Sequence, residues 1–396
     1  MLQKISTKDL AVGMFIANTG VSWLTHKGLC TLEGIIPTED LLLKIQAKYS
    51  EAYIDLARSR KGSLPPALAD LLHPKPVEGY LPPQPRVPMR EELEVASAIY
   101  DDSIVKAKEL MDNMRKGNLT VSLEEPMVGD ILESLDRNVD ALFGLCKLRQ
   151  ADEYTYTHCV NVSVLATMFG RGLGLDRDMQ KMLGLGGLFH DLGKAKIPME
   201  IVNAPRKLSD AEFSIMKQHP ALGYKQLISV PGIPDTLLAI VAEHHERYDG
   251  TGYPKGLKAD EISLAGVITG IADVFDALSS RRCYKEALPL PKVTSILYSM
   301  RDRDFPASMV EKFIVLMGVF PVGSCVQLSD GRSGIVSGSN PANVLKPKVI
   351  VLQDDKGRNI KQMELDLMNE QGVEVSTAVS AATLKVDPAD ILGIGG

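Results

Sequence analysis

The chain has 396 residues, which is enough for two or three domains with sizeable cores. It is 45% hydrophobic and 24% charged, and its net charge of −6 argues against electrostatic binding to a nucleic-acid polymer or an acidic membrane. The five cysteines are scattered and form no CxxC pair, which is typical of reduced thiols. Neither a signal-peptide core nor a membrane-spanning apolar run occurs, so we expect a soluble, cytoplasmic protein without a membrane span.

Residues 1–62 predict a small α+β domain. Short β-compatible pieces, such as the one around Ile5, precede a stretch with helical spacing over residues 38–49. Thr38 is a candidate N-cap for this helix, because its hydroxyl can accept a bond from a free backbone N–H of the first turn. Residues 52–56 are a candidate closing strand.

Residues 63–90 contain eight prolines and predict an extended linker, because proline removes backbone donors and restricts its neighbours. Residues 91–150 predict a helical pair, whose second helix begins after Pro126 and keeps a three/four apolar spacing to Cys146. Such a pair could carry a signal or form a homodimer. The run is shorter than the three or four heptads of a coiled coil, so packing against its own domain is favoured.

Residues 151–319 predict a domain that is almost entirely helical, since the apolar spacing is helical throughout and strand signals are sparse. Helices are expected over residues 176–192 and 263–280, and Ser209 is a candidate N-cap for a helix that runs to His219.

Residues 320–396 predict a small antiparallel β unit, in which Asp330 and Gly331 mark a hairpin turn. The tail after Val375 is rich in small residues and is expected to be a loosely docked arm. The predicted fold class is therefore mainly α, with a small N-terminal α+β domain and a small C-terminal antiparallel β unit.

The stretch Leu188–Lys194, LFHDLGK, places His190 and Asp191 side by side at the end of an apolar, helix-like run. Imidazole and carboxylate are ligands of divalent metals, and a carboxylate can bridge two ions. Gly193 is expected to end the helix just beyond the pair. Taken alone, such a pair is more often a hydrogen-bonded dyad than a metal site.

Histidines elsewhere in the helical region change this interpretation. Five of the seven lie near predicted helix ends, namely His158, His190, His219, His244 and His245. Asp273 lies within an otherwise apolar helix, where a buried carboxylate needs a partner or a metal. A helical domain can gather such side chains into one cavity. Their number exceeds the needs of one tetrahedral site, and two ions that share Asp191 fit it.

Three motifs in this order resemble the HD-GYP family, a branch of the HD phosphohydrolase superfamily. They are HDLGK at 190–194, HHERYDGTGYP at 244–254 and ADVFDALSSRRCYKEAL at 272–288. The resemblance implies an HD-type helical bundle domain with two or three iron or manganese ions. It also implies hydrolysis of the bacterial second messenger cyclic di-GMP to pGpG, and often to GMP. The N-terminal part resembles, more weakly, a domain of unknown function that often precedes such domains.

The resemblance implies two sets of metal ligands that share Asp191. The first set is His158, His190, Asp191 and Asp273. The second set is Asp191, His219, His244 and His245. A third metal, which a subset of the family binds, would need a carboxylate where this chain has Tyr154. We therefore expect two divalent ions, most simply iron or manganese.

The resemblance also implies a substrate site. Its contacts would be Asp152, Lys194, Tyr253, Asp276, Arg282 and Lys285. The three cations suit phosphate oxygens, and Tyr253 in the loop Gly252, Tyr253, Pro254 would lie near a guanine. Asp191 and Lys194 are the expected catalytic residues. The sequence does not identify the proton donor to the leaving oxygen, for which Asp276 and a metal-bound water are the candidates.

Two other functions remain open. Some members of the family hydrolyse 3′,3′-cyclic GMP-AMP, and no residue here separates the two purines. A receptor that binds a cyclic dinucleotide without cleaving it, and acts through protein partners, belongs to a different class. The family commonly contacts signalling proteins through the surface of its GYP loop, so catalysis and partner binding could coexist.

Overall fold

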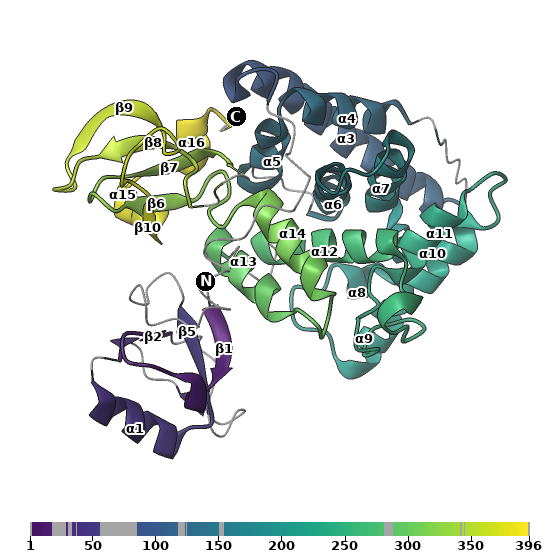
Figure 1. Ribbon diagram of the computed structural model, residues 1–396. Helices are drawn as coiled ribbons and strands as arrows, with labels where there is room; N and C mark the ends of the chain where they lie inside the picture. Colours follow the sequence, from purple (N-terminus) through teal and green to yellow (C-terminus); the bar gives the residue numbers. More distant parts are fainter. Residues whose placement is uncertain are drawn as a thin grey trace. The chain divides into compact units, whose positions relative to one another are not determined.

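The computed structural model describes residues 2–17, 29–30, 34–36, 38–55, 85–117, 123, 125–149, 154–280, 288–340, 343 and 345–394. The chain forms two compact units, one that contains both sheets and helix α13 and one that contains most of the other helices (Figure 1). The predicted fold class is confirmed. Most of the predicted linker, residues 63–90, lies outside the described residues.

The N-terminal part of the first unit is a small sheet with one helix beside it in the chain. Its strands are β1 (Leu2–Ser6), β2 (Phe15–Ile16), β3 (Leu29–Cys30), β4 (Gly34–Ile35) and β5 (Glu51–Asp55). The strand order is β1-β5-β2-β4, and β3 also pairs with β5. Short helix η1 (Thr7–Asp9) follows β1, and α1 (Glu39–Lys48) precedes β5. The Thr38 hydroxyl caps α1 by accepting a bond from the Leu41 N–H, as predicted.

The C-terminal part of the first unit is an antiparallel sheet in the order β10-β6-β7-β8-β9. Its strands are β6 (Cys325–Leu328), β7 (Ser333–Gly338), β8 (Lys348–Gln353), β9 (Asn359–Asp366) and β10 (Val375–Ala378). The predicted turn at Asp330 and Gly331 joins β6 to β7. The prediction of a loose tail is wrong, because β10 pairs with β6 and is followed by α15 (Ala381–Leu384).

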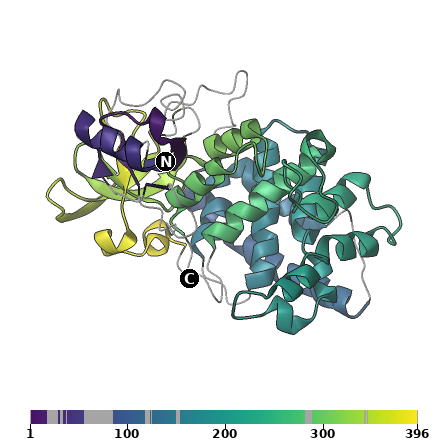
Figure 2. The same cartoon turned by 90° about the horizontal axis from the view of Figure 1, so that it is seen from below.

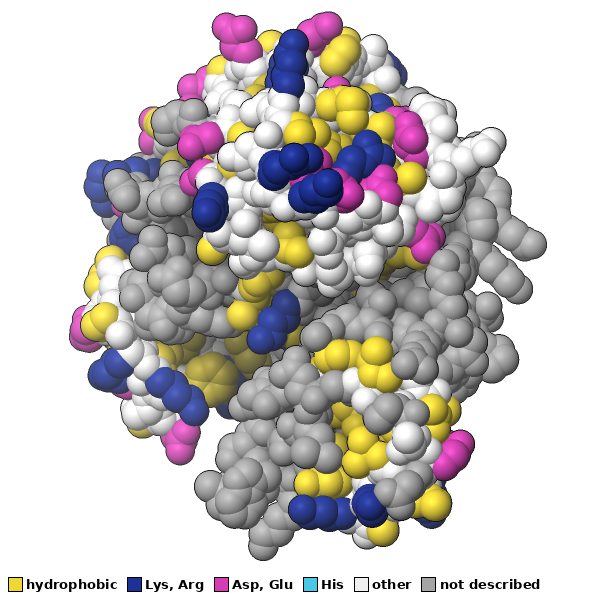
Figure 3. Space-filling model, turned by 90° about the vertical axis from the view of Figure 1, so that its left-hand side faces the viewer, with side chains coloured by type: hydrophobic (Ala, Val, Ile, Leu, Met, Phe, Trp, Pro, Cys, Tyr) yellow, Lys and Arg dark blue, Asp and Glu magenta, His cyan; other side chains and the backbone are white. Residues whose placement is uncertain are grey.

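Charges of both signs lie close together on the face drawn in Figure 3, which looks onto the side that carries the C-terminal sheet. In the hairpin turns of the C-terminal sheet, Arg332 pairs with Asp330 and Arg358 pairs with Asp354. The described charges of this sheet are thus mixed in sign rather than gathered into a basic surface.

The second unit is a bundle of helices, with α6 and α12 near its middle in Figure 1 and the helices again side by side in Figure 2. Its longer helices are α3 (Met89–Arg115), α4 (Pro126–Arg137), α5 (Val139–Leu148), α6 (Tyr154–Gly172), α7 (Arg177–Phe189), α10 (His219–Leu227), α11 (Asp235–Glu243), α12 (Leu264–Ser279) and α14 (Ala307–Met317). Its short helices are η2 (Leu192–Lys196), α8 (Met199–Val202), α9 (Asp210–Met216), η3 (Ala259–Glu261) and α16 (Pro388–Leu392). Helix α13 (Leu290–Ser299), which follows α12, groups with the first unit.

Several helices end earlier than their apolar spacing predicts. The long helix expected after Pro126 is broken at Asn138, whose extended backbone ends α4 and whose side chain caps α5 by accepting from the Asp140 N–H. Helix α9 begins with the predicted Ser209 cap but ends at Met216, before His219. Apolar spacing continues across the break at Asn138 because α4 and α5 both carry buried apolar residues, so periodicity alone does not reveal it.

No helix among the described residues is long and apolar enough to cross a membrane.

The core of the helical unit contains an aromatic cluster, in which the ring of Phe313 from α14 lies 5.0 Å from that of Phe169 in α6 and 5.2 Å from that of Phe275 in α12. All three rings are almost fully buried. Because Phe275 lies two residues after Asp273, this cluster supports the part of α12 that carries the predicted ligand.

Substitution Phe313→Ala is expected to lower the free energy of unfolding by about 3–5 kcal/mol, because it removes a buried ring and leaves a cavity between α6, α12 and α14. Chemical denaturation of the purified protein would measure the loss. Phe213→Ala is the matched control, since Phe213 is 46% exposed and its loss should change stability by about 0.5 kcal/mol or less. Equal effects of the two substitutions would contradict the assigned core.

Candidate metal centre

Three of the predicted histidine ligands lie just beyond the C-terminal end of a helix. His190 follows α7, His219 lies three residues after the end of α9, and His244 follows α11. The last carbonyl groups of a helix have no partner within it, so they are free to accept other bonds. The Nδ1 of each ring lies at 2.7–3.0 Å from the carbonyl oxygen three residues earlier in the chain.

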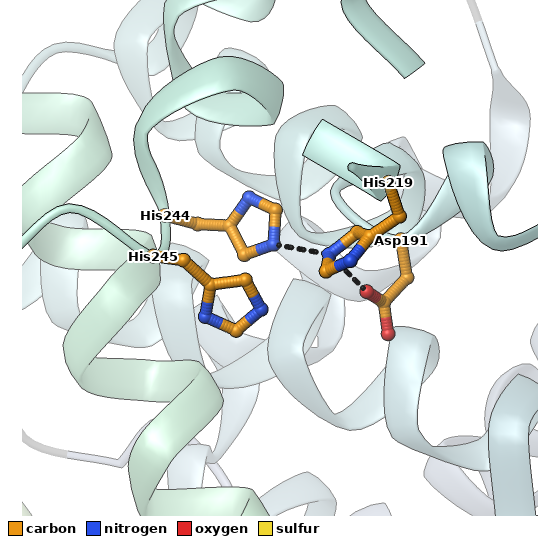
Figure 4. Close-up of side chains that lie close together, drawn as sticks. All are labelled: Asp191, His219, His244 and His245. Carbon is orange, nitrogen blue, oxygen red and sulfur yellow. Dashed lines mark hydrogen bonds and ion pairs between the residues drawn. The ribbon is translucent and has the colours of Figure 1, made fainter. Parts of the chain in front are cut away.

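These bonds decide which nitrogen of each ring faces inward. A carbonyl oxygen can only accept, so the proton of a neutral ring is assigned to Nδ1 and the lone pair to Nε2. The Nε2 atoms of His219 and His244 lie 3.2 Å apart (Figure 4). Two lone pairs at this distance repel each other unless a proton or a metal ion lies between them. The arrangement therefore fits a cation.

One group of potential ligand atoms comprises Asp191, His219, His244 and His245, whose atoms all lie within 4.8 Å of one another. Figure 4 shows the imidazole rings and the carboxylate turned toward a common centre. A second group comprises His158, His190 and Asp273, within the same limit. All of these side chains are buried except that of His245, which is partly exposed.

Asp191 lies between the two groups. Its Oδ1 is 3.2 Å from Nε2 of His219, and its Oδ2 is 3.3 Å from Nε2 of His190 and 3.7 Å from Nε2 of His158. The Oδ1 of Asp191 and the Nε2 of His190 are buried and form no well-aligned hydrogen bond with the described residues. Buried polar atoms are normally satisfied, so these two fit metal ligation.

The pKa shifts in the site favour the neutral form of the histidines around His244, which is the form that can bind a metal ion. Burial lowers the pKa of His219, His244 and His245, which keeps their rings neutral. Burial alone would raise the pKa of Asp191, but the neighbouring His190 and Lys194 outweigh it, so that its pKa falls well below the usual range. For His158, burial acts downward, but Asp273 and Asp276 outweigh it and raise the pKa to about 9.

Lys194 lies beside the shared carboxylate, with its Nζ 2.5 Å from Oδ2 of Asp191 and its side chain 23% exposed. Burial lowers the pKa of Lys194, but Asp191 more than compensates, and the pKa is raised.

Helix α7 ends at Phe189, so Gly193 does not end it as predicted. Gly193 instead allows η2 to approach α10, because a Cβ there would lie 1.9 Å from the His219 carbonyl oxygen.

The buried side chain of Glu246, a residue that is 2% exposed, supports the loop that contains Gly252, Tyr253 and Pro254. Its carboxylate accepts bonds from the N–H groups of Lys255 and Leu257, at 2.7 and 3.0 Å. Gly252 crosses this turn so closely that a Cβ would lie 2.3 Å from the backbone nitrogen of Arg247.

The ring of Tyr253 covers the centre from one side, at 4.7 Å from the ring of His245 and 6.5 Å from that of His219. The ring of Phe213 from α9 also packs edge to face against the ring of Tyr253, with the centroids 6.5 Å apart. Sequence analysis missed Phe213, since an exposed phenylalanine in a polar helix carries no motif. It also missed the role of Glu246, although this residue lies within the motif HHERYDGTGYP.

The structure contradicts the expectation that Asp276 contacts the substrate or donates a proton. Asp276 is fully buried behind His158, with Oδ2 at 2.7 Å from Nδ1 of the ring and Oδ1 bonded to Lys147, Asn161 and Ser280. Burial alone would raise its pKa, but Lys147 and His158 outweigh this and lower it, so it holds no proton to give. Both oxygens are engaged away from solvent, and this excludes Asp276 as a substrate contact or proton donor.

The remaining predicted substrate residues, Asp152, Arg282 and Lys285, lie outside the described residues. The structure thus brings together the seven predicted ligands, Lys194 and Tyr253. Lys147 and Asn161, which the sequence analysis did not single out, bond to Asp276 behind His158, at positions 129 and 115 residues before Asp276 in the chain.

A His-Asp pair at a helix end, joined by histidines from neighbouring helix ends, is the arrangement of an HD domain. The family described as "HD domain" matches residues 132–307. The "Domain of unknown function (DUF3391)" matches residues 2–122, and the "KOW domain associated with HD domain" matches residues 325–386. HD domains are metal-dependent, and the His/Asp cluster of this chain is suited to metal binding.

A cyclic di-GMP phosphodiesterase of Pseudomonas aeruginosa is 31% identical over 375 residues, which cover 93% of this chain and 89% of that protein. The chain therefore belongs to the HD-GYP family of cyclic di-GMP phosphodiesterases. The response regulator RpfG of Xanthomonas campestris, also a cyclic di-GMP phosphodiesterase, is 34% identical over 49% of this chain and 52% of its own length. A 3′3′-cGAMP-specific phosphodiesterase of Vibrio cholerae is 38% identical over 37% of this chain and 33% of its own length.

Substitution Glu246→Ala is expected to loosen the loop of Tyr253, because it leaves two backbone N–H groups without their acceptor, at about 1–3 kcal/mol each. Amide hydrogen exchange of Lys255 and Leu257 should become about tenfold faster or more. Glu200→Ala, at an exposed position in α8, is the matched control and should leave this exchange unchanged. Unaltered exchange in the Glu246 variant would show that other contacts hold the loop.

Proposed function

We propose that the chain hydrolyses cyclic di-GMP to the linear dinucleotide pGpG, and further to GMP, with a centre of two divalent metal ions. The observation that carries this proposal is the carboxylate of Asp191 between two groups of buried imidazole and carboxylate ligands. The similarity over 93% of the chain to a cyclic di-GMP phosphodiesterase supports the same substrate. Hydrolysis would lower the level of a bacterial second messenger.

The ligands would divide into two sets that share Asp191. His158, His190, Asp191 and Asp273 would hold one ion, and Asp191, His219, His244 and His245 would hold the other. Imidazole and carboxylate suit iron and manganese, which are the metals we propose. When bound, two such ions supply an activated water and neutralise charge on the phosphoryl oxygens.

The chain's own residues would bind and orient the phosphodiester. Lys194 remains cationic and partly exposed beside Asp191, so its ammonium is available to a phosphate oxygen and to the charge that develops there. In the reaction, water adds to phosphorus, the bond to the ribose 3′ oxygen breaks, and that oxygen takes up a proton. Tyr253 would exclude water from one side and stack near a guanine.

Further substrate contacts are proposed at Asp152, Arg282 and Lys285. Arginine binds phosphate through two parallel bonds and lysine through a point charge, so both cations suit a dinucleotide with two phosphodiesters. Protein partners at the GYP surface and a homodimer stay predictions.

A second candidate substrate is 3′,3′-cyclic GMP-AMP, which the similarity to a Vibrio cholerae enzyme specific for it favours. The two cyclic dinucleotides share their phosphodiester ring and differ in one purine, so the metal centre serves both. The match to that enzyme covers about a third of this chain, whereas the cyclic di-GMP phosphodiesterase matches nearly all of it. Cyclic di-GMP is therefore the first choice.

Protein purified without oxygen and loaded with iron or manganese should convert cyclic di-GMP to pGpG, and cyclic GMP-AMP should be cleaved more slowly. Chromatographic separation of the nucleotides and metal analysis of the same sample would measure turnover and about two ions per chain, as a shared-carboxylate site requires. Metal-loaded protein that binds either nucleotide without cleaving it would instead support a receptor.

Asp191→Ala should abolish hydrolysis and release metal, because it removes the carboxylate that faces both ligand groups. Asp178→Ala is the matched control, since Asp178 is an exposed carboxylate on α7, the helix that leads to Asp191. Full metal content and full activity in the Asp191 variant would refute the shared role.

Metal binding should release about one proton per chain near pH 7.5. The pKa of His158 is raised to about 9, so its ring carries a proton below that pH in the metal-free protein and must lose it to become a ligand. Metal affinity should therefore rise with pH until about pH 9. Calorimetric titration with Mn²⁺ in buffers of different ionisation enthalpy would count the protons. The release should disappear in His158→Ala, and its persistence there would contradict the assignment.

A further inference from the structure

His158 differs from three of the other predicted histidine ligands in how its Nδ1 is held. His190, His219 and His244 each bond to a free carbonyl near a helix C-terminus. His158 lies in the first turns of α6, where carbonyl groups are already used by the hydrogen bonds of the helix. Its Nδ1 needs an acceptor from elsewhere, and the described structure supplies Asp276 from α12, at 2.7 Å.

Asp276 is in turn held by a lysine that lies outside the three motifs. The Nζ of Lys147 in α5 is 2.5 Å from Oδ1 of Asp276 and 3.0 Å from the Ser279 hydroxyl. The side chains of Lys147 and Asp276 are both 0% exposed. A lysine side chain without any exposure is rare in proteins and is normally paired when it occurs.

Neutral donors complete this network. Asn161 donates to the same Oδ1 of Asp276 at 2.9 Å and, through its own oxygen, accepts from the Tyr100 hydroxyl at 2.7 Å. Tyr100 lies in α3 and Asn161 in α6, so the carboxylate is held from several helices at once. Among the described partners of Asp276, however, only Lys147 is a side-chain cation besides the histidine itself.

Stability alone does not account for the pair. Replacing a buried ion pair with apolar side chains of the same volume is often neutral or stabilising, so folding does not require charges at this position. A carboxylate that must point one oxygen at a metal-binding histidine does require an anchor for its other oxygen. Groups that orient metal ligands from behind typically change metal affinity when they are removed.

We infer that Lys147 is a positioning residue of the metal centre, which anchors Asp276 so that the carboxylate fixes the ring of His158 toward Asp273 and Asp191. The Nε2 of His158 then lies 3.1 Å from Oδ1 of Asp273. This inference rests on the proposed metal centre and adds to it a residue of α5. Without the ammonium, the donors that the described residues leave to Oδ1 of Asp276 are the neutral groups of Asn161 and Ser280, and the ring would lose its fixed orientation.

The test is metal affinity, measured without activity. Apo-protein would be titrated with Mn²⁺ while electron paramagnetic resonance follows the free ion, so that both binding steps are resolved. Lys147→Met should weaken one of the two steps by about tenfold or more and leave the other near the wild-type value. Lys147→Gln, which keeps a hydrogen-bond donor but no charge, should weaken the same step and serves if the Met variant does not fold.

The matched control is Glu92→Gln, which breaks another ion pair of the same unit that has a buried carboxylate. Glu92 is 2% exposed and bonds to Arg137 at 2.6 and 2.9 Å and to Ser134 at 2.7 Å, none of which is a proposed ligand. It should lower the unfolding temperature and leave both Mn²⁺ affinities unchanged.

Wild-type affinities at both steps in either folded Lys147 variant would overturn the inference. An equal loss in both steps for the Lys147 and Glu92 variants would also overturn it, because it would reveal general destabilisation. Failure of the proposed metal centre itself would give a different result from failure of the inference about Lys147, because the wild-type protein would then bind no Mn²⁺ at all.

Discussion

An imidazole ring can present only one nitrogen to a given ion, so each histidine ligand needs an acceptor inside the protein for its other N–H. In this chain the free carbonyls of helix C-termini provide most of these acceptors, as for His190, His219 and His244. These three rings therefore lie where the helices α7, α9 and α11 end.

His158 follows a different rule because it lies in the first turns of its helix. Its acceptor is the carboxylate of Asp276, and the carboxylate depends on Lys147 in α5. The helices before the His-Asp motif thus do more than connect domains, since α3 and α5 both reach the network behind the ligand. The match of the HD domain family from residue 132 includes α5 and agrees with this role.

The other side of the centre is closed by a loop rather than a helix. Glu246 holds the backbone of this loop, and Tyr253 lies over His245. Rigid ligands on helix ends and a separately supported aromatic ring suit a site that must keep metals in place while it admits a nucleotide. Phe213 extends the aromatic surface beyond Tyr253. The group of metal-binding side chains and the aromatic loop beside it are therefore built by different parts of the same unit.

The sequence by itself determined the fold class and the His and Asp residues of the centre, because helical spacing and long motifs are local properties of the chain. It also placed the caps at Thr38 and Ser209, which depend on a few neighbouring residues. It could not assign Asp276, which shares a motif with Asp273 but turns behind His158, or reveal Lys147, whose partner is 129 residues away. Only the tertiary structure decided these roles, because orientation and burial arise when distant helices pack together.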